Sequence, residues 1–122
     1  MAVPHILIVE DDLIIALDIE CIVLEALDAK TTVVSSVETA LPHLDEEIDF
    51  AFLDIDVRDG KTFGLAERLQ DRGIPFTFVS GSNRARLPDM LQGSPFIAKP
   101  YVPNAIMQVL DEVVPPEKRA SA

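Results

Sequence analysis

Tryptophan is absent from the sequence, and aromatic residues make up only 6% of its 122 residues. A core must therefore be built mainly from Ile, Leu, Val and Ala, which suits packed layers of helix and sheet. The single cysteine, Cys21, cannot form an internal disulfide, and its neighbours offer no metal or nucleophile partner. No apolar run approaches the ~20 residues that span a bilayer, and no signal segment opens the chain. These absences predict a cytoplasmic protein without membrane contact.

Basic residues are also few: 10 stand against 21 acidic residues, which gives a formal net charge of −11. A phosphate backbone would be repelled by this charge, so direct binding of nucleic acid is not expected. The length fits one domain and leaves no room for an output domain of ordinary size. We expect a stand-alone domain over residues 1–114 and a flexible tail over residues 115–122.

Short buried-type runs alternate with stretches of helical spacing. Apolar or β-branched runs predict strands over residues 5–9, 31–35, 49–53, 75–80 and 96–98. Helical spacing predicts helices over residues 12–27, 37–44, 61–71, 84–91 and 103–114. Because such alternation requires right-handed crossovers, we predict an α/β fold, a five-stranded parallel sheet of order 2-1-3-4-5 with helices on both faces. Ligands then bind beyond the carboxyl ends of strands one and three.

Acidic residues stand at those two strand ends. Glu10 and Asp11 follow the first strand, and Asp54 follows the third. Carboxylates ~4 Å apart repel by roughly 4 kcal/mol at an effective dielectric of 20, so three of them require a cation. A ligand set of oxygens alone favours Mg²⁺, with Mn²⁺ as the alternative. Asp12, directly after them, is better explained as the cap of the next helix.

A hydroxyl and an amine end at the same predicted edge of the sheet. Ser80 ends the fourth strand, and Lys99 follows the fifth. Together with the carboxylates, they match the needs of phosphoryl transfer, whose transition state spreads negative charge over equatorial oxygens.

Four segments carry a family resemblance. They are Ile-Leu-Ile-Val-Glu-Asp-Asp at residues 6–12, Phe-Leu-Asp at 52–54, Val-Ser-Gly at 79–81 and Ala-Lys-Pro-Tyr at 98–101. In order and spacing they resemble the receiver domain of two-component response regulators, and the flavodoxin-like receiver fold follows from that resemblance. It implies that Asp54 is the phosphoacceptor, with Asp11, Glu10 and the backbone carbonyl of Asp56 holding the metal. It also implies that Ser80 binds the phosphoryl group, that Lys99 pairs with it, and that Phe96 is the switch aromatic, although an ordinary core Phe96 fits equally well.

The resemblance further implies a function. A histidine kinase or histidine phosphotransferase would donate the phosphoryl group to Asp54, and an unnamed downstream protein would read the helix 4, strand 5 and helix 5 face. Such a module is a signalling switch with intrinsic autophosphorylation and dephosphorylation chemistry, and not a metabolic enzyme.

Two features depart from the usual receiver pattern, and a third segment resembles a subgroup of the family. Arg58 stands where many receivers have proline, and the stretch between Ser80 and Lys99 is short, which predicts an abbreviated fourth helix that begins late, near residues 87–88. Residues 75–81 resemble a subgroup of stand-alone alphaproteobacterial receivers with a Phe-Ala-Thr-Gly-Tyr-like motif, with Ser in place of Thr and Ser82 in place of Tyr.

The first helix has more apolar surface than one sheet contact requires. Its predicted core face consists of Ile15, Ile19, Ile22, Val23 and Ala26. Leu13, Leu17 and Leu24 widen the apolar arc, and we hypothesise that they contact the kinase or phosphotransferase helix. Burial by neighbouring loops or by the fifth helix is the alternative for these leucines.

Two rival functions use the same residues. The Asp54-Ile55-Asp56 run also resembles the Asp-x-Asp opening of haloacid-dehalogenase-type phosphatases, but in that family the nucleophile strand comes first and acids follow the lysine. The other rival is a receiver-like binding module whose output does not depend on phosphate.

Overall fold

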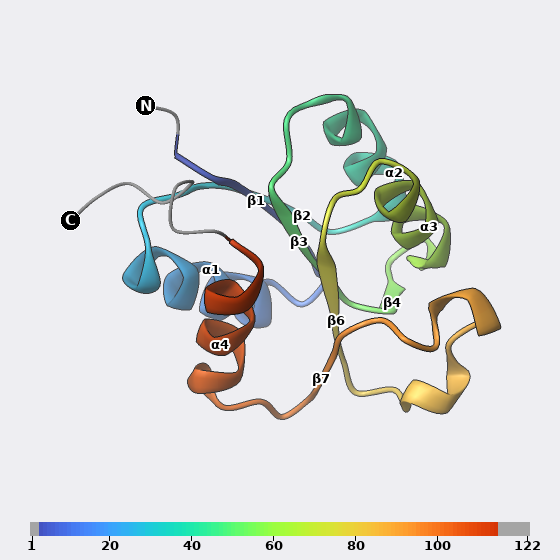
Figure 1. Ribbon diagram of the computed structural model, residues 1–122. Coiled ribbons are helices and arrows are strands. Elements are labelled where there is room, and N and C mark those ends of the chain that lie inside the picture. Colours follow the sequence, from blue (N-terminus) through green and yellow to red (C-terminus); the bar gives the residue numbers. More distant parts are fainter. Residues whose placement is uncertain (1–2, 115–122) are drawn as a thin grey trace.

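The computed structural model describes residues 3–114, and the predicted tail over residues 115–122 lies outside them. Helices and strands alternate along the described chain (Figure 1). The strands are β1 His5–Val9, β2 Lys30–Val34, β3 Phe50–Leu53, β4 Asp56–Val57, β5 Gly60–Lys61, β6 Phe76–Ser80 and β7 Phe96–Ala98. The α-helices are α1 Leu13–Ala26, α2 Val37–Ala40, α3 Phe63–Asp71 and α4 Pro103–Val113, and the 3₁₀ turns are η1 Leu41–Asp45, η2 Arg84–Arg86 and η3 Asp89–Leu91.

The main sheet is parallel, with the order β2-β1-β3-β6-β7. Because β4 and β5 form a separate antiparallel hairpin, this order is 2-1-3-4-5 when only the strands of the main sheet are counted. The predicted fold class is therefore confirmed. Val9 at the end of β1 pairs with Leu53 at the end of β3, so the residues that follow them lie side by side.

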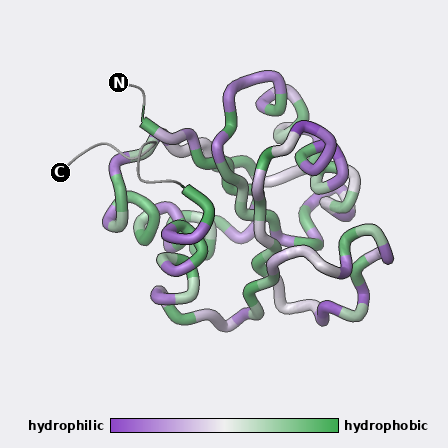
Figure 2. The backbone as a smooth tube through the Cα atoms, in the orientation of Figure 1, coloured by the Kyte–Doolittle hydropathy of each residue, from purple (hydrophilic) through white to green (hydrophobic). Residues whose placement is uncertain are grey.

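Each face of the sheet has its own core. In β1, Ile6 and Ile8 point to the face covered by α1 and α4, whereas Leu7 and Val9 point to the face covered by α2 and α3. All four side chains are fully buried, since alternate residues of a strand face opposite sides. Figure 2 shows the resulting concentration of hydrophobic residues in the central strands. Burial on both faces explains the continuous apolar runs in the sequence.

The predicted α-helix over residues 84–91 is wrong: this stretch forms the two 3₁₀ turns η2 and η3. Pro88 has no backbone N–H to donate and disfavours the helical conformation of the residue before it, Leu87, which is extended at φ −68° and ψ 141°. The side chains of Leu87 and Leu91 are nevertheless buried in the core beside α3. They fill part of the space that a helix would occupy.

Helix α1 begins after Asp12, whose side chain accepts hydrogen bonds from the N–H groups of Ile14 and Ile15, as the capping interpretation predicts. Its buried residues are Ala16, Ile19, Ile22 and Val23. Ala26 was wrongly assigned to the core face: it is exposed, because the chain becomes extended at Leu27 and buries that side chain instead.

Candidate functional site

Three carboxylates meet at the carboxyl ends of β1 and β3. The N–H of Asp54 donates to the carbonyl of Val9 at 2.9 Å, which brings Asp54 beside Glu10. One carboxylate oxygen from each of Glu10, Asp11 and Asp54 lies within 4.8 Å of the other two. Glu10 and Asp54 are buried, whereas Asp11 is exposed and leaves the cluster open to solvent. The strand ends that the sequence placed together are adjacent in the structure.

Lys99 extends into this cluster from the residue after β7. Its Nζ donates to Glu10 Oε1 at 2.6 Å and to Asp54 Oδ2 at 3.2 Å. Burial works against the charged ammonium, but the hydrogen bond to Glu10 and the attraction of Asp54 outweigh it and raise the pKa of Lys99. Burial raises the pKa of Glu10 to about 7, with Lys99 opposing the rise and Asp54 adding to it. The free-energy cost of removing this carboxylate from water is thus only partly offset by its hydrogen bond with Lys99.

Ser80 ends β6 at the same edge of the sheet, and its backbone carbonyl accepts a hydrogen bond from the N–H of Lys99 at 2.9 Å. The Ser80 side chain is buried, and its Oγ accepts a hydrogen bond from the N–H of Ser82 at 3.1 Å. The hydroxyl proton of Ser80 has no acceptor among the hydrogen bonds that the structure gives this side chain. The Ser80 hydroxyl can therefore donate to an oxygen that enters the pocket.

Sequence reasoning missed Thr62, which fixes the backbone of Asp54. Thr62 is completely buried, and its Oγ1 donates to the carbonyl oxygen of Asp54 at 2.5 Å. Its N–H donates to the carbonyl of Ile55 at 3.0 Å. A threonine directly before a helix would be interpreted from sequence as an N-cap, yet this side chain makes no capping bond to α3. The hydroxyl instead holds the turn that presents Asp54.

Asp56 was predicted to offer a backbone carbonyl to a metal, and that role stays a prediction. Its side chain forms an ion pair with Lys61 across the β4–β5 hairpin and accepts from Ser82 Oγ at 3.3 Å. The hydrogen bond from Lys61 is the main cause that lowers the pKa of Asp56. This carboxylate thus connects the hairpin after Asp54 with the loop after Ser80.

The hairpin also contains Arg58, where many receivers have proline, and it is anchored on its other side by Asp59. The Asp59 carboxylate accepts hydrogen bonds from the N–H groups of Val37 at 2.8 Å and Glu38 at 3.0 Å. These are the first two residues of α2, so Asp59 caps that helix from a distant part of the chain. Asp59 thus anchors the hairpin that follows Asp54 to the start of α2.

Phe96, the predicted switch aromatic, is the first residue of β7 and is half-buried. Its ring centroid lies 6.5 Å from that of Phe78, and the Arg84 guanidinium carbon lies 5.4 Å from its centroid. The ring therefore contacts both an aromatic side chain of the core and a charged side chain. The structure does not test a switch movement.

The three leucines of the docking hypothesis remain uncovered. Leu13 is 65% exposed, and Leu17 and Leu24 are each 48% exposed, so burial by neighbouring loops does not account for them. A groove of about 410 Å³ lies beside this helix, between α1 and the turn that follows Lys99. Tyr101 in that turn donates a hydrogen bond to Asp18 of α1 at 2.6 Å. An apolar surface with a fixed groove thus lies next to the acidic cluster.

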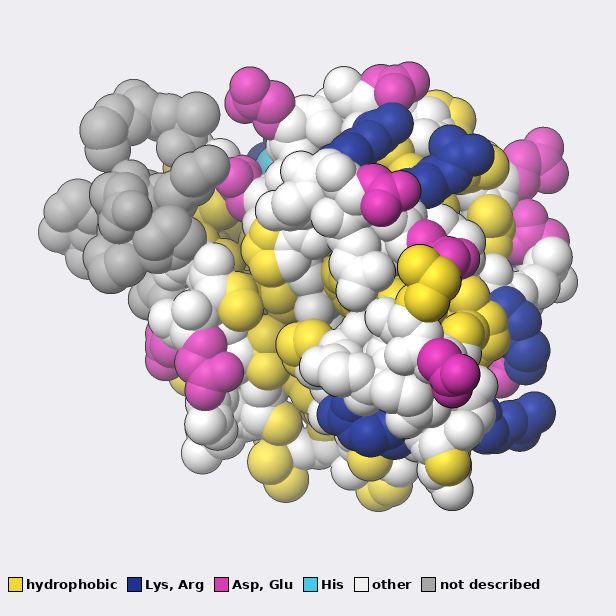
Figure 3. All heavy atoms as spheres, turned by 45° about the vertical axis from the view of Figure 1, so that its right-hand side comes forward, with side chains coloured by type: hydrophobic (Ala, Val, Ile, Leu, Met, Phe, Trp, Pro, Cys, Tyr) yellow, Lys and Arg dark blue, Asp and Glu magenta, His cyan; other side chains and the backbone are white. Residues whose placement is uncertain are grey.

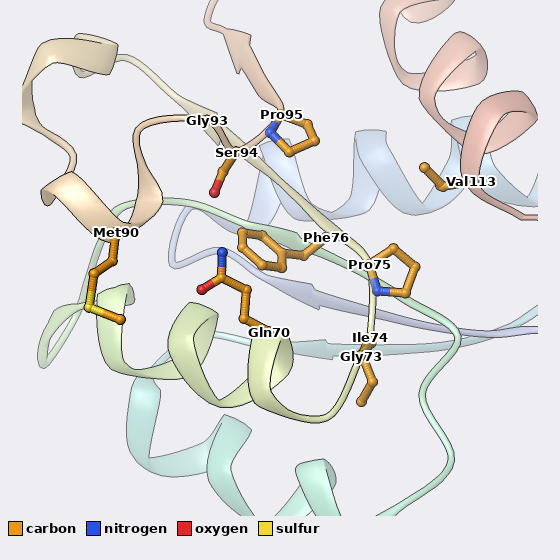
Figure 4. Close-up of a pocket in the computed structure, with 10 residues that line it drawn as sticks. All are labelled: Gln70, Gly73, Ile74, Pro75, Phe76, Met90, Gly93, Ser94, Pro95 and Val113. Carbon is orange, nitrogen blue, oxygen red and sulfur yellow. The ribbon is translucent and has the colours of Figure 1, made fainter.

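A second hollow, of about 540 Å³, lies at the opposite edge of the sheet (Figure 4). It is bounded by the residues before β6 and β7, among them Pro75 and Pro95, and by Met90 of η3. No side chain that lines it is acidic or basic. The charged side chains that could take part in chemistry therefore lie at the carboxyl ends of the strands.

The donor set of the acidic cluster fits a divalent cation that prefers oxygen. Carboxylate oxygens within 4.8 Å of one another can bind a single ion with small adjustments, and the exposed side leaves room for water and a ligand's oxygens. No Cys or His belongs to the cluster, which disfavours zinc. Among residues 3–114, no helix is both long and apolar enough to span a bilayer.

No protein-family model and no curated protein matches the sequence. Solved structures do match: SdrG from Sphingomonas melonis is 33% identical, covers 94% of this chain and 99% of its own, and has a TM-score of 0.77. A CheY-like response regulator receiver domain protein from Methanospirillum hungatei is 22% identical over 91% of this chain and 93% of its own, at a TM-score of 0.78. The receiver domain of a Pseudomonas aeruginosa sensor histidine kinase, which has a magnesium ion coordinated in its active site cleft, is 18% identical over 93% of this chain and 98% of its own, at a TM-score of 0.76.

The fold, the strand-end carboxylates and these matches agree along nearly the whole chain. The chain belongs to the response regulator receiver domains.

Proposed function

We propose that the protein is a phosphoacceptor switch that takes a phosphoryl group onto Asp54 from a phosphohistidine of a histidine kinase or phosphotransferase. The observation that carries this proposal is the contact of the Lys99 ammonium with both Glu10 and Asp54 in a cluster open on the Asp11 side. That arrangement presents a carboxylate nucleophile together with a fixed positive charge.

In the proposed transfer, an oxygen of Asp54 attacks phosphorus, the phosphorus–nitrogen bond breaks, and the donor imidazole leaves with the electron pair and is protonated. Lys99 Nζ, 3.2 Å from Asp54 Oδ2, is placed to attract the equatorial oxygens of the transferring group. The Ser80 hydroxyl can donate to another of these oxygens. Water later hydrolyses the aspartyl phosphate and restores the carboxylate.

Glu10, Asp11 and Asp54 are the side chains that would hold Mg²⁺, with the backbone carbonyl of Asp56 as a further ligand. When bound, this cation would neutralise the carboxylates and stabilise charge on the phosphoryl oxygens. The magnesium ion in the cleft of the Pseudomonas receiver domain supports this assignment. Mn²⁺ has similar ligand preferences and is the alternative.

The product that matters is the modified protein itself, so we class it as a signalling switch in a phosphorelay and not as a metabolic enzyme. We place it in the cytoplasm, where phosphoryl donors made with ATP are found. Since no α-helix forms over residues 84–91, a downstream protein would read a surface made by η2, η3, β7 and α4. Membership of the alphaproteobacterial subgroup stays a prediction.

For the donor, we propose docking on the exposed leucines of α1. Leu13 and Leu17 lie on the first turns of α1, which begins three residues after Glu10. A partner helix packed there would bring its histidine close to Asp54 while burying apolar area. A substitution Leu17→Glu should slow transfer from the kinase and leave labelling by acetyl phosphate unchanged, because the small donor needs no docking surface.

The proposed function is tested by labelling with acetyl phosphate and Mg²⁺, read by intact-protein mass. We expect one phosphoryl group per chain, lost in Asp54→Asn and strongly reduced in Asp11→Ala. Labelling that survives Asp54→Asn would refute the assignment of the acceptor. No labelling in the wild type would favour a binding module that does not depend on phosphate, and turnover of small phosphate esters would favour a phosphatase.

A further inference from the structure

The segment between β6 and β7, residues 81–95, is held without an α-helix. Leu87 and Leu91 anchor it in the core, and the side chain of Gln92 donates to the carbonyl of Leu87 at 2.5 Å. These contacts fix the middle of the segment. The two ends, one after Ser80 and one before Phe96, need a separate connection.

Arg84 supplies that connection. Its Nη1 donates to the carbonyl of Gln92 at 2.9 Å and to the carbonyl of Ser94 at 2.6 Å, while its guanidinium carbon lies 5.4 Å from the centroid of the Phe96 ring. Charge-assisted hydrogen bonds and a cation–π contact thus come from one side chain. Figure 3 shows the side of the molecule that carries α3 and this segment, with Lys and Arg side chains along its lower edge.

A short path joins Arg84 to the phosphoacceptor pocket. Ser80 is four residues before Arg84, and its Oγ accepts the N–H of Ser82. Asn83 caps η2 by accepting the N–H of Ala85 at 2.7 Å, so the turn that carries Arg84 is braced from within. A backbone shift at Ser80 should therefore also displace the backbone of Arg84.

We propose that Arg84 is a positioning residue that holds residues 81–95 and Phe96 in one arrangement and passes occupancy of the Asp54 pocket to the exposed start of β7. This inference rests on the proposed function. When the Ser80 side chain turns to bring its hydroxyl to a bound phosphoryl oxygen, its Oγ moves away from the Ser82 N–H and that hydrogen bond is lost. The cap turn then shifts, the guanidinium leaves the carbonyls of Gln92 and Ser94, and the Phe96 ring is released.

The first test needs no phosphate. Hydrogen exchange of the Gln92 and Ser94 amides is compared in the wild type, Arg84→Gln and Arg86→Gln, with β1 and β3 amides as the reference for global stability. Arg86 lies on the same turn and its replacement removes the same charge, but the structure gives its side chain no hydrogen bond to the carbonyls of the segment. Arg84→Gln should speed exchange about tenfold, because charge-assisted bonds set the local opening free energy.

The matched control, Arg86→Gln, should exchange like the wild type. Arg84→Lys should exchange at a rate between those of the wild type and Arg84→Gln, since an ammonium keeps the charge but lacks the planar fork of donors. Equal exchange in Arg84→Gln and Arg86→Gln would overturn the positioning role. Faster exchange of the β1 and β3 amides in Arg84→Gln would also count against it, because the effect would then be global.

The second test adds Mg²⁺ and beryllium fluoride as a mimic of the phosphoryl group. Exchange of the same amides should rise in the wild type and in Arg86→Gln, and should rise no further in Arg84→Gln. If acetyl phosphate labels the wild type on Asp54 but beryllium fluoride does not change exchange of the segment's amides, the transmission role alone is overturned. Wild-type protein that takes no label would refute the proposed function and transmission with it, while the first test would still decide whether Arg84 holds the segment.

Discussion

Thr62 offers a direct measure of how firmly the backbone of Asp54 is held. The substitution Thr62→Val keeps the shape of the side chain but removes the hydroxyl that donates to the Asp54 carbonyl at 2.5 Å in a fully buried position. The carbonyl is then left without this donor, and an unsatisfied buried group costs about 1–3 kcal/mol.

This cost translates into a melting temperature. A chain of 122 residues has an unfolding entropy of about 0.26 kcal/mol per kelvin at its midpoint, so a loss of about 1–3 kcal/mol lowers the melting temperature by about 4–12 °C. The control Thr62→Ser keeps the hydroxyl and loses one buried methyl group, worth about 0.8 kcal/mol or about 3 °C. The valine variant should therefore be the less stable of the two.

The assay is thermal unfolding followed by circular dichroism, combined with the rate of Asp54 labelling by acetyl phosphate. Thr62→Val should label more slowly than Thr62→Ser, because the turn that presents Asp54 is no longer fixed. If the valine variant melted like the wild type and the serine variant melted lower, the hydroxyl would contribute nothing, and the reasoning from this hydrogen bond would be refuted.

Three further predictions concern the metal, a helix cap and the single tyrosine. Mg²⁺ at about 100 times its dissociation constant should raise the melting temperature by about 10 °C, the equivalent of about 2.7 kcal/mol, and the shift should be lost in Asp11→Ala in a calorimetric titration. The Glu38 and Val37 N–H groups lower the pKa of Asp59, so the ionised carboxylate stabilises the fold above the unfolded pKa of about 3.9, and this stabilisation is lost as pH falls through the lower folded pKa. The difference in melting temperature between the wild type and Asp59→Asn should therefore disappear below about pH 4. Burial, then the bond to Asp18, raises the pKa of Tyr101, so an ultraviolet titration should find its ionisation above the usual value of about 10, and Asp18→Asn should lower the midpoint.

The sheet and the acidic cluster could be predicted because their signals are carried by side chains that are unusual in their places. Continuous apolar runs mark strands buried on both faces, and acids directly after them have no packing role. Once the order of the strands is known, Glu10 and Asp54 must be neighbours, as the pairing of Val9 with Leu53 shows. Lys99 follows from the same logic at the end of β7.

The helix predicted over residues 84–91 failed for a local reason. Apolar spacing at Leu87 and Leu91 fits a helix, and both side chains are buried in the structure. Pro88 between them removes a donor and favours an extended Leu87, so two 3₁₀ turns bury the same side chains without a helix. The hydrophobic pattern was interpreted correctly for burial and wrongly for backbone conformation.

The missed contacts around the site share one property: each joins a side chain to a backbone group. Thr62 donates to the carbonyl of Asp54, Arg84 donates to two carbonyls near β7, and Asp59 accepts from two N–H groups of α2. Because every residue has a carbonyl and all except proline have an N–H, the residue type of the backbone partner does not reveal the contact. Only the path of the folded chain determines which backbone group the side chain meets. The reactive groups of this receiver can therefore be predicted from its sequence, whereas the contacts that hold those groups in place are seen only in the folded structure. Substitutions at Thr62, Arg84 and Asp59 should accordingly alter the positions and stability of the switch while its chemical groups stay intact.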